Sequence, residues 1–309
     1  MIKLFTHTDL DGIGCAILAR LAFADDVDIT YCDYDDINNE IYRRIQSDKI
    51  LNYDMVFITD ISIEEENAVI LDGISYVKIK LLDHHPTAQH LNKYDWCTIK
   101  IEDEETHIKT SGTELYYNWL INHGYLNKDG NLDRFVEIVR DYDTWRWSQL
   151  GEKGIICKQI NDLLYLYGRE RFVNWCIAKI KFDSFSKFPN LSDTEKLVLE
   201  IKQREIDKYI VEKNKQIIFL ELCGKQCGFV FAENYFSELG NKLCKLNPDI
   251  DLIAMIDIAS KAVSYRTIKD DIDLGKDIAQ LFGGGGHPKS AGSKFSENVQ
   301  FKVIEKIFN

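Results

Sequence analysis

Several features that would assign this chain of 309 residues to a particular class are missing from it. It has no excess of basic residues, because 38 lysines and arginines stand against 50 aspartates and glutamates and give a formal net charge of -12. Proteins that bind long nucleic acids independently of sequence usually carry a basic surface. We therefore expect a short or small anionic substrate held by metals, and no long duplex nucleic acid as a partner.

Long apolar runs and a cysteine framework are missing as well. No run approaches the roughly 20 apolar residues that span a bilayer, and Met1 leads directly into a strand pattern rather than a signal peptide. The 8 cysteines have no regular spacing, and the closest pair, Cys223 and Cys227, lacks the second pair that a zinc site needs. These absences predict a cytoplasmic protein with free thiols and no membrane partner.

The first half of the chain alternates apolar strands with helical segments. Strands are predicted at 2–6, 27–32, 55–60 and 77–82, and the segments from 133 to 142 and from 150 to 185 are predicted to be mostly helical. Alternation of this kind is typical of βαβ units around a parallel sheet. The length exceeds what one hydrophobic core usually supports, so we expect two domains of an α/β protein.

A long charged helix separates this region from the remainder. Ser192-Asp193-Thr194-Glu195 fits the capping-box pattern that begins a helix, and apolar residues then recur among charges to about residue 214. Beyond it, predicted hairpins at 216–232 and 252–267, helices at 237–246 and 273–282, and a final strand and helix indicate a smaller α+β domain. The predicted organisation is a catalytic domain, a connecting helix and a substrate-binding domain, at 1–187, 188–215 and 216–309.

Four separated segments bring acids and histidines together, and three of them directly follow predicted strands. These residues are His7, Asp9 and Asp11, then Asp60, then Asp83, His84 and His85, and finally Asp141 and Asp143. The carboxyl ends of neighbouring parallel strands face one crevice, so side chains from different strand ends can converge there. Carboxylates and imidazoles are ligands that divalent metals prefer. The sequence therefore predicts a two-metal site.

Each of these residues has a structural explanation when taken alone. Asp9 or Asp11 could cap the helix after the first strand, and Asp60 could cap a helix that begins near Ser62. A lone histidine is more often a satisfied core or surface residue. Two adjacent imidazoles at a buried strand end would be costly without partners, and the co-occurrence of the segments favours a metal site.

The run Gly283–Gly286, followed by His287, is the main feature of the smaller domain. Glycine loses much conformational entropy on folding, so a run of them indicates that the chain needs their backbone freedom. Backbone N–H groups that approach an anion are one reason, and a flexible hinge is the alternative. Arg266, at the end of a predicted strand, is a candidate phosphate clamp through its bidentate guanidinium, although an arginine alone is more often a surface residue.

In combination these motifs resemble those of the DHH phosphoesterase family, whose members carry a C-terminal DHHA1 domain. The four acidic and histidine-bearing segments resemble the family's motifs one to four: His7-Thr8-Asp9-Leu10-Asp11-Gly12, Asp60, Asp83-His84-His85 and Asp141-Tyr142-Asp143. The glycine run with His287, together with Ser264–Thr267, resembles the DHHA1 domain. The family includes RecJ-type exonucleases, nanoRNase-type oligoribonucleases, cyclic-dinucleotide phosphodiesterases and family II pyrophosphatases.

The resemblance implies two Mn²⁺ ions, with Mg²⁺ as the alternative. His7 and Asp9 would hold one ion, Asp11 and His84 would hold the other, and Asp60 would bridge both. Asp83 and His85 are the implied catalytic residues, with His85 contacting the scissile phosphate. The fourth-motif ligand is Asp141 when the apolar run Ile138-Val139 is matched, and Asp143 is the alternate. The substrate-binding residues implied in the smaller domain are Arg266, Gly284, Gly285, Gly286 and His287.

The resemblance and the acidic charge together predict a metal-dependent phosphodiesterase that cleaves short oligonucleotides to 5′-mononucleotides with a hydroxide activated by two metals. The alternatives are a RecJ-like exonuclease for single-stranded DNA and a phosphoesterase for 3′-phosphoadenosine 5′-phosphate (pAp) or cyclic dinucleotides. A family II pyrophosphatase is disfavoured, because its C-terminal domain lacks the glycine-histidine motif. A non-catalytic nucleotide-binding regulatory protein would have lost ligands that this chain retains. A homodimer is compatible with the sequence.

Overall fold

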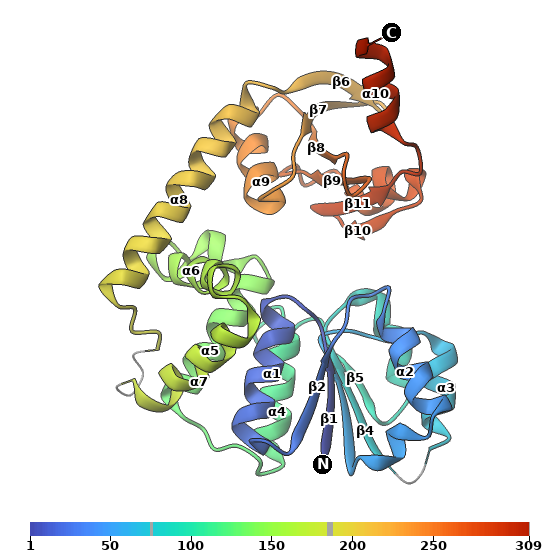
Figure 1. The fold of residues 1–309 in the computed structure, drawn as a ribbon, viewed down its shortest axis with the longest axis vertical. Helices are drawn as coiled ribbons and strands as arrows, with labels where there is room; N and C mark the ends of the chain where they lie inside the picture. The colour runs from blue at the N-terminus through green and yellow to red at the C-terminus, as the bar shows by residue number, and fades with distance from the viewer. Residues whose placement is uncertain (75–76, 184–187, 309) are drawn as a thin grey trace. The chain divides into compact units, whose positions relative to one another are not determined.

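The chain forms two compact units, each with its own sheet (Figure 1). The computed structural model describes residues 1–74, 77–183 and 188–308, and the units are Met1–Leu199 and Glu200–Asn309. The predicted fold class, a parallel-sheet α/β domain followed by a smaller α+β domain, is confirmed. The division falls within helix α8 (Asp193–Asn214), and the predicted boundary at residue 187 lies outside the described residues.

The sheet of the first unit has five parallel strands in the order β2-β1-β3-β4-β5. The strands are β1 (Ile2–Thr6), β2 (Val27–Tyr31), β3 (Met55–Thr59), β4 (Lys78–Asp83) and β5 (Cys97–Ile99). The chain moves outward from β1 to β2 and then returns past β1 to β3, so the strand order reverses between β1 and β3. Such a reversal opens a crevice at the carboxyl ends of the strands, where ligands bind in open α/β sheets.

Helices cover both faces of this sheet (Figure 1). On one face lie α1 (Leu10–Phe23), α4 (Gly112–Asn122), α5 (Gly130–Asp143), α6 (Glu152–Tyr167), α7 (Arg169–Phe182) and the short η3 (Arg146–Gln149). On the other lie α2 (Ile37–Gln46), α3 (Glu65–Asp72) and the 3₁₀ turns η1 (Lys49–Asn52) and η2 (Pro86–Lys93). Side chains of the central strands β1, β3 and β4 alternate between the two cores, as Leu4 and Phe5 do on β1.

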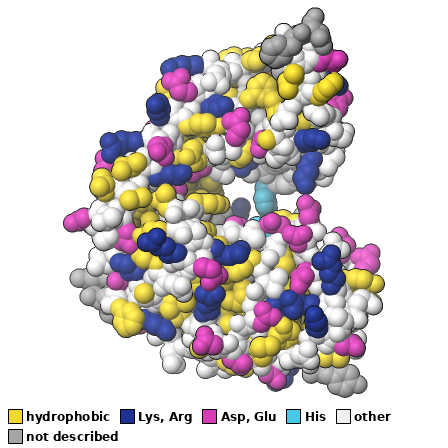
Figure 2. Space-filling view, viewed as in Figure 1, with side chains coloured by type: hydrophobic (Ala, Val, Ile, Leu, Met, Phe, Trp, Pro, Cys, Tyr) yellow, Lys and Arg dark blue, Asp and Glu magenta, His cyan; other side chains and the backbone are white. Residues whose placement is uncertain are grey.

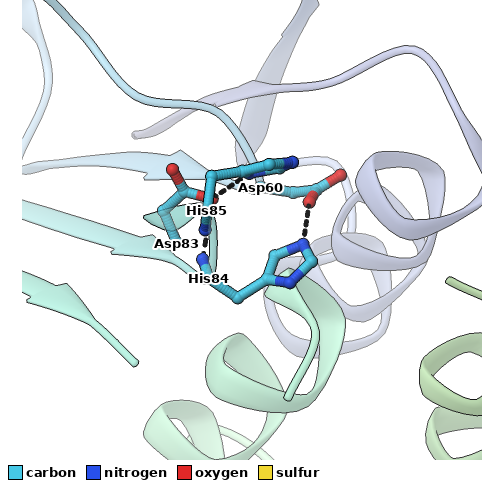
Figure 3. Close-up of side chains that lie close together, drawn as sticks. All are labelled: Asp60, Asp83, His84 and His85. Atoms are coloured by element: carbon cyan, nitrogen blue, oxygen red, sulfur yellow. Dashed lines mark hydrogen bonds and ion pairs between the residues drawn. The ribbon is translucent and has the colours of Figure 1, made fainter. Parts of the chain in front are cut away.

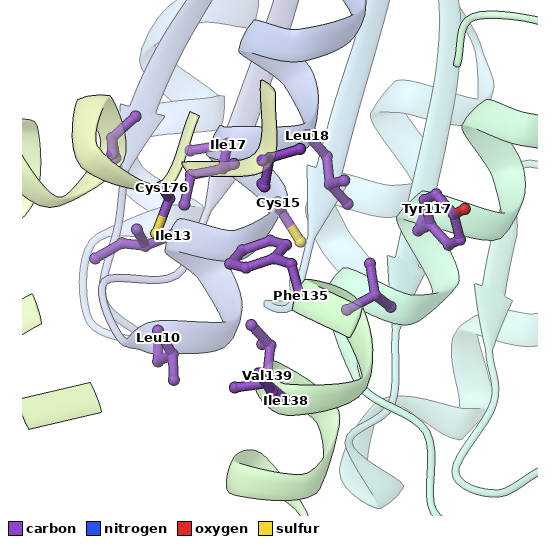
Figure 4. Packing of buried hydrophobic residues seen from close by; sticks show 14 of the residues in the cluster. Leu10, Ile13, Cys15, Ile17, Leu18, Tyr117, Phe135, Ile138, Val139 and Cys176 are labelled. Carbon is purple, nitrogen blue, oxygen red and sulfur yellow. The ribbon is translucent and has the colours of Figure 1, made fainter. Parts of the chain in front are cut away.

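Helix α1 is the most closely packed element of the first core. Its residues from Leu10 to Ala19 are all buried, and Figure 4 shows Ile13 and Ile17 together with Phe135 of α5. A Cβ at Gly14 would lie 2.2 Å from Oγ1 of Thr113, so only glycine lets α1 and α4 approach this closely. The packing fixes the N-terminal end of α1 directly after β1, where the first predicted metal ligands lie.

The second unit contains a six-stranded sheet in the order β10-β11-β9-β8-β7-β6, antiparallel except for the parallel pair β7 and β8. Its strands are β6 (Ile218–Leu222), β7 (Lys225–Phe231), β8 (Leu252–Asp257), β9 (Ala262–Arg266), β10 (Gly285–His287) and β11 (Ser290–Lys294). Its helices are α9 (Phe236–Leu246) and α10 (Val299–Phe308). Both predicted hairpins are confirmed.

The segment predicted as a helix at 273–282 is helical, but it is not a regular α-helix. The segment forms a π-helical turn, η4 (Leu274–Ile278), followed by a 3₁₀ turn, η5 (Ala279–Phe282). Gly275 lies against the glycine run, where a Cβ would come within 2.5 Å of the Gly286 carbonyl oxygen. Glycine also disfavours a regular helix. The close approach to β10 therefore replaces the predicted α-helix.

The surface carries charges of both signs. On the face drawn in Figure 2, lysine and arginine side chains are interspersed with those of aspartate and glutamate. Within residues 1–74, 77–183 and 188–308, every helix is too short or too polar to cross a bilayer.

The predicted capping box at the start of α8 is confirmed. Oγ of Ser192 accepts a hydrogen bond from the Glu195 backbone N–H at 3.3 Å, and the Glu195 carboxylate accepts one from the Ser192 N–H at 2.6 Å. The other oxygen of Glu195 accepts hydrogen bonds from Nε1 of Trp175 and the hydroxyl of Tyr167, at 2.6 and 3.2 Å. Glu195 therefore joins the start of α8 to α6 and α7.

Replacing Glu195 by alanine should destabilise the first unit by about 2 kcal/mol, because the cap is lost and the Trp175 N–H loses its acceptor. Urea denaturation followed by tryptophan fluorescence would measure the change. Glu200→Ala is the matched control on the same helix, since Glu200 is exposed and pairs with Arg204 at 3.5 Å. Its effect should stay below about 0.5 kcal/mol, and equal losses in the two variants would contradict the role of Glu195.

Candidate metal centre

The predicted metal ligands lie just beyond the carboxyl ends of neighbouring strands, which end at the same level of the sheet. They come from both sides of the point where the strand order reverses. Thr6, Thr59 and Leu82 are register partners on β1, β3 and β4. His7 and Asp60 therefore follow neighbouring strands directly, and His84 follows the next strand after Asp83. This register brings together residues that are far apart along the chain.

The first group of ligand atoms belongs to His7, Asp9 and Asp60. Nδ1 of His7 lies 3.0 Å from Oδ2 of Asp9 and 3.9 Å from Oδ2 of Asp60. Asp9 also caps α1, because its Oδ1 accepts a hydrogen bond from the Gly12 N–H at 3.1 Å. Asp9 therefore caps α1 with one carboxylate oxygen and contributes the other to the cluster.

The second group belongs to Asp11, His84 and Asp143. Nε2 of His84 lies 3.6 Å from Oδ2 of Asp11 and 3.5 Å from Oδ2 of Asp143. The same nitrogen lies 3.2 Å from Oδ1 of Asp60, and Figure 3 shows the His84 ring directed at that carboxylate. Asp60 thus presents one oxygen to each group and lies between them.

The start of α4 packs against two buried acids of the cluster, Asp11 and Asp60. Both oxygens of Asp11 accept backbone hydrogen bonds, from the N–H of Gly112 at 2.6 Å and of Thr113 at 2.9 Å. A Cβ at Gly112 would lie 2.4 Å from Cβ of Asp60, whose own φ is +56°. The N-terminus of a helix carries partial positive charge, so α4 stabilises negative charge at the centre of the cluster.

Asp83 contacts both His84 and His85 and fixes their orientation. Its Oδ1 lies 2.7 Å from Nδ1 of His85 and accepts the backbone N–H of His84 at 2.8 Å (Figure 3), and its other oxygen accepts the hydroxyl of Ser62. Burial alone would raise the pKa of Asp83, but His85, His84 and the Ser62 hydroxyl together outweigh burial and the pKa is lowered. Burial would lower the pKa of His85, but the hydrogen bond and charge of Asp83, with the charges of Asp11 and Asp9, raise it instead. Nε2 is therefore the nitrogen of His85 left for other partners, and Tyr34 occupies it at 3.0 Å.

The two candidate ligands of the fourth segment lie in different surroundings. Asp141 is buried, and its Oδ1 pairs with Arg140 at 3.2 Å and with Arg146 at 2.9 Å. Asp143 lies beside His84. Residues two apart on an α-helix are separated by about 200° around its axis, so α5 can direct only one of them at the cluster. The structure brings Asp143 to the other ligands and does not bring Asp141.

The crowded acids shift one another's protonation. Burial, reinforced by Asp11 and Asp9, raises the pKa of Asp60 well above its usual range, and the same causes raise the pKa of Asp143. Burial lowers the pKa of His84. Burial would raise the pKa of Asp9 too, but the hydrogen bond and charge of His7, together with the Gly12 backbone N–H, outweigh burial and lower that pKa to about 2. Like charges at such short range need a positive partner.

The cluster fits a pair of divalent cations. Oδ2 of Asp60 is buried and has no hydrogen-bond partner within the described part of the chain, and the buried Nδ1 of His7 lies near Oδ2 of Asp9 and Oδ2 of Asp60 without an aligned hydrogen bond to either. Buried polar atoms are normally satisfied, and both of these belong to the first ligand group. Within each group the ligand atoms lie no more than 4.8 Å apart, and the mixture of carboxylate and imidazole suits Mn²⁺ or Mg²⁺. A cation in each group would supply the missing partners and neutralise the acids.

In the second unit, Arg266 and His287 lie in one row across three strands. Arg266 on β9 is paired in register with Ser290 on β11, which is paired with His287 on β10. Directly paired residues of antiparallel strands share a face of the sheet. The guanidinium of Arg266 donates to Oγ of Ser237 at 3.2 Å and to the Tyr265 carbonyl at 2.8 Å, so it is held beside the start of α9.

The last two glycines of the run, Gly285 and Gly286, lie in strand β10, and Gly283 and Gly284 precede it. A Cβ at Gly284 would lie 2.0 Å from the Gly292 carbonyl oxygen, and one at Gly286 would lie 2.6 Å from Cα of Ala291. These two glycines are therefore required by packing on β11. A Cβ at Gly285 would meet nothing within 4 Å. The fold itself does not require glycine at position 285.

Asp33 and Tyr34, which follow β2, lie beside the cluster and were not predicted from the sequence. Oδ1 of Asp33 lies 3.8 Å from Nε2 of His7, and the ring of Tyr34 lies 5.0 Å from the His7 ring and 5.9 Å from that of His85. The rule that located the other residues, polar side chains directly after a strand, applies here too. The intermediate burial along β2 made its end less distinct.

A comparison of the sequence with characterised proteins finds one full-length relative. Oligoribonuclease NrnB of Bacillus subtilis (strain 168) is 37% identical over 312 residues, covering 100% of this chain and 76% of that protein. No protein-family model matches the chain.

The fold is similar to those of solved RecJ structures. Exonuclease RecJ bound to manganese gives a TM-score of 0.58 at 11% identity, covering 99% of this chain and 88% of that one. RecJ in complex with Mn²⁺ from Thermus thermophilus also gives 0.58, at 12% identity, covering 99% of this chain and 51% of that one. At these identities the likeness concerns the fold alone.

Replacing Asp60 by asparagine tests the balance between repulsion and cation binding. The raised pKa of Asp60 means that its charged form destabilises the metal-free fold, a cost that appears as pH rises through that pKa and is absent at lower pH, where the group is protonated. In chelator at pH ~8 we expect the variant to be more stable than the parent by about 1 kcal/mol, or roughly 2–4 °C in melting temperature. With Mn²⁺ or Mg²⁺ the parent should be more stable than the variant, because the variant has lost a metal ligand.

Thermal denaturation in chelator measures the repulsion in the metal-free protein, and thermal denaturation with each cation measures the stabilisation by that cation. Asp25→Asn is the control, since Asp25 is exposed and outside the cluster, and it should behave like the parent in both conditions. The same order of stabilities with and without cation would contradict the assignment of Asp60.

Proposed function

The chain belongs to the DHH/DHHA1 phosphoesterase family and is a metal-dependent, nuclease-type hydrolase, and we propose that it cleaves short oligoribonucleotides to 5′-mononucleotides with two Mn²⁺ ions. The observation that carries the proposal is the position of Asp60 between two groups of ligand atoms. The homology to an oligoribonuclease supports the substrate class. We further propose that the enzyme works in the cytoplasm, where its free cysteines stay reduced.

The proposed ligands are the residues of the two groups. His7 and Asp9 would hold one ion, Asp11, His84 and Asp143 would hold the other, and Asp60 would bridge them. Asp143 replaces Asp141 in this proposal because its carboxylate lies 3.5 Å from His84. Two bound cations lower the pKa of a water and neutralise charge that develops on the phosphate.

His85 is the proposed catalytic residue among those that do not hold an ion. Asp83 fixes its ring through Nδ1 and raises its pKa, so the protonated form is favoured. When substrate takes the place of the Tyr34 hydroxyl at Nε2, this nitrogen can donate to a phosphate oxygen, or transfer its proton to the leaving oxygen. Asp83 is a positioning residue in this account, because it acts through His85.

We propose that the second unit binds one nucleotide of the substrate through a phosphate other than the scissile one. Arg266 supplies a fixed guanidinium, which pairs well with phosphate oxygens. His287 lies in the same row of the sheet, and Gly285 offers backbone without a side chain. The acidic net charge of the whole chain favours substrates short enough to be held by these few contacts.

Product analysis tests this function. We expect 5′-mononucleotides from 5′-labelled RNA of two to about ten nucleotides in Mn²⁺, and no reaction in chelator. The panel should include the matching DNA, pAp, cyclic dinucleotides and pyrophosphate. Faster cleavage of long single-stranded DNA would favour the RecJ-like alternative, and hydrolysis only of pAp or cyclic dinucleotides would favour those substrates instead.

Two variants of α5 test the choice of ligand. Asp143→Asn should lower kcat by about a thousandfold or more, because it removes a ligand and its negative charge. Asp141→Asn should chiefly reduce stability, because Arg140 and Arg146 lose a buried partner. Oligonucleotide hydrolysis, metal content and melting temperature of both variants check this, and the opposite pattern would restore Asp141 as the ligand.

Gly285→Ala tests the role of the glycine run without disturbing the fold. The new Cβ meets no atom of the described chain within 4 Å, so the unfolding midpoint should stay unchanged. If substrate approaches the backbone here, KM for a dinucleotide should rise about tenfold or more, since steric exclusion of a phosphate removes its hydrogen bonds. Gly284→Ala is the contrasting variant and should destabilise the second unit. An unchanged KM for Gly285→Ala would contradict substrate binding at this strand.

A further inference from the structure

A pocket of about 180 Å³ adjoins the metal cluster and shares His85 with it. Its lining comes wholly from the first unit: Tyr34, Asn38, Ser62, Ile63, Glu64, Asp83, His85, Thr87, Ala88 and His90. We call it the His85 pocket. Ile63 and Ala88 are buried and give it an apolar base, whereas Glu64 and Thr87 are exposed at its rim.

The lining favours a neutral group over a phosphate. No lysine or arginine is among the lining residues, two of them, Glu64 and Asp83, are acids, and only the imidazoles of His85 and His90 could carry positive charge. A neutral group rich in hydroxyls would find acceptors there. The volume is below the about 300–1,000 Å³ typical for drug-sized ligands, so the pocket suits a single sugar ring rather than a whole nucleotide.

Glu64 has hydrogen-bonding capacity to spare. It precedes α3, yet its side chain makes no capping hydrogen bond. Its backbone is engaged, because the N–H donates to Oδ1 of Asn38 at 2.8 Å and the carbonyl accepts from the Ala68 N–H at 3.1 Å. Asn38 itself is occupied, because the same oxygen accepts from Asn67 at 3.0 Å. A carboxylate can accept several hydrogen bonds. Glu64 is therefore the acceptor in the His85 pocket that the fold leaves for a ligand.

Tyr34 connects the pocket to the reacting centre. Its hydroxyl lies 3.0 Å from Nε2 of His85, and its ring packs 5.0 Å from that of His7. A phosphate held at the metal cluster and contacted by His85 is thus next to the pocket wall. The group bonded to that phosphate is within reach of the pocket.

We propose that the His85 pocket binds the ribose of one of the two nucleotides joined by the scissile phosphate, and that Glu64 accepts a hydrogen bond from its 2′-hydroxyl. The 2′-hydroxyl is the group that distinguishes RNA from DNA, so the pocket makes the enzyme selective for RNA. This inference rests on the proposed function and adds how the sugar is recognised.

Four adenylate dinucleotides test it: the all-ribo and all-deoxy forms and the two chimaeras with one ribose each. With the unchanged enzyme in Mn²⁺, removing the 2′-hydroxyl from one particular sugar should lower kcat/KM about tenfold, the cost of one lost hydrogen bond to a charged acceptor. The chimaeras identify which sugar it is. Glu64→Ala should lower kcat/KM for the all-ribo substrate by the same factor and abolish the discrimination at that sugar, as in a double-mutant cycle.

Glu66→Ala is the matched control, because Glu66 is an exposed acid on α3 outside the pocket lining. It should keep the full discrimination, and both variants should unfold at the same denaturant concentration as the parent. Hydrolysis of all four dinucleotides at equal rates, or unchanged discrimination in Glu64→Ala, would overturn the inference while leaving the proposed function intact. Failure to hydrolyse any of them would overturn both.

Discussion

The crowding of acids at the carboxyl edge of the parallel sheet is the constraint on which the rest of this structure depends. Asp9, Asp11, Asp60 and Asp143 lie around two histidines in groups whose ligand atoms are within 4.8 Å of one another. Two like charges about 4 Å apart repel by roughly 4 kcal/mol at the effective dielectric of a protein surface. The start of α4 relieves part of this, and cations would relieve the remainder. The ionised acids of this cluster are therefore stable together only when positive charge lies between them.

The fold supplies the rigidity that such a site requires. The ligands come from the ends of three strands in register and from the helices α1 and α5, and the core fixes these elements on both faces of the sheet. Asp83 and Tyr34 then hold the two nitrogens of His85, so the orientation of this ring is fixed by contacts within the protein. Sites whose groups are held in place in advance lose little free energy in ordering them during reaction.

Much of this was predictable from the sequence because the signals are local. The four longer parallel strands, the capping box of Ser192 and Glu195 and the strand-end ligands all follow from patterns within a few residues. The three-residue strand β5 was too short to give a pattern. The choice between Asp141 and Asp143 depends on which face of α5 contacts the cluster. The roles of Gly284 and Gly286 depend on contacts with β11. Neither kind of contact can be inferred from the neighbouring residues in the sequence. The structure was needed where tertiary contacts decide.

A crystal structure grown with Mn²⁺ and recorded at the manganese absorption edge would test the central claim most directly. The account predicts two anomalous peaks about 3.5–4 Å apart, as in other two-metal sites, one beside His7 and Asp9 and one beside His84 and Asp143, with Asp60 contacting both. A single peak, or peaks that leave Asp60 without a metal contact, would contradict it.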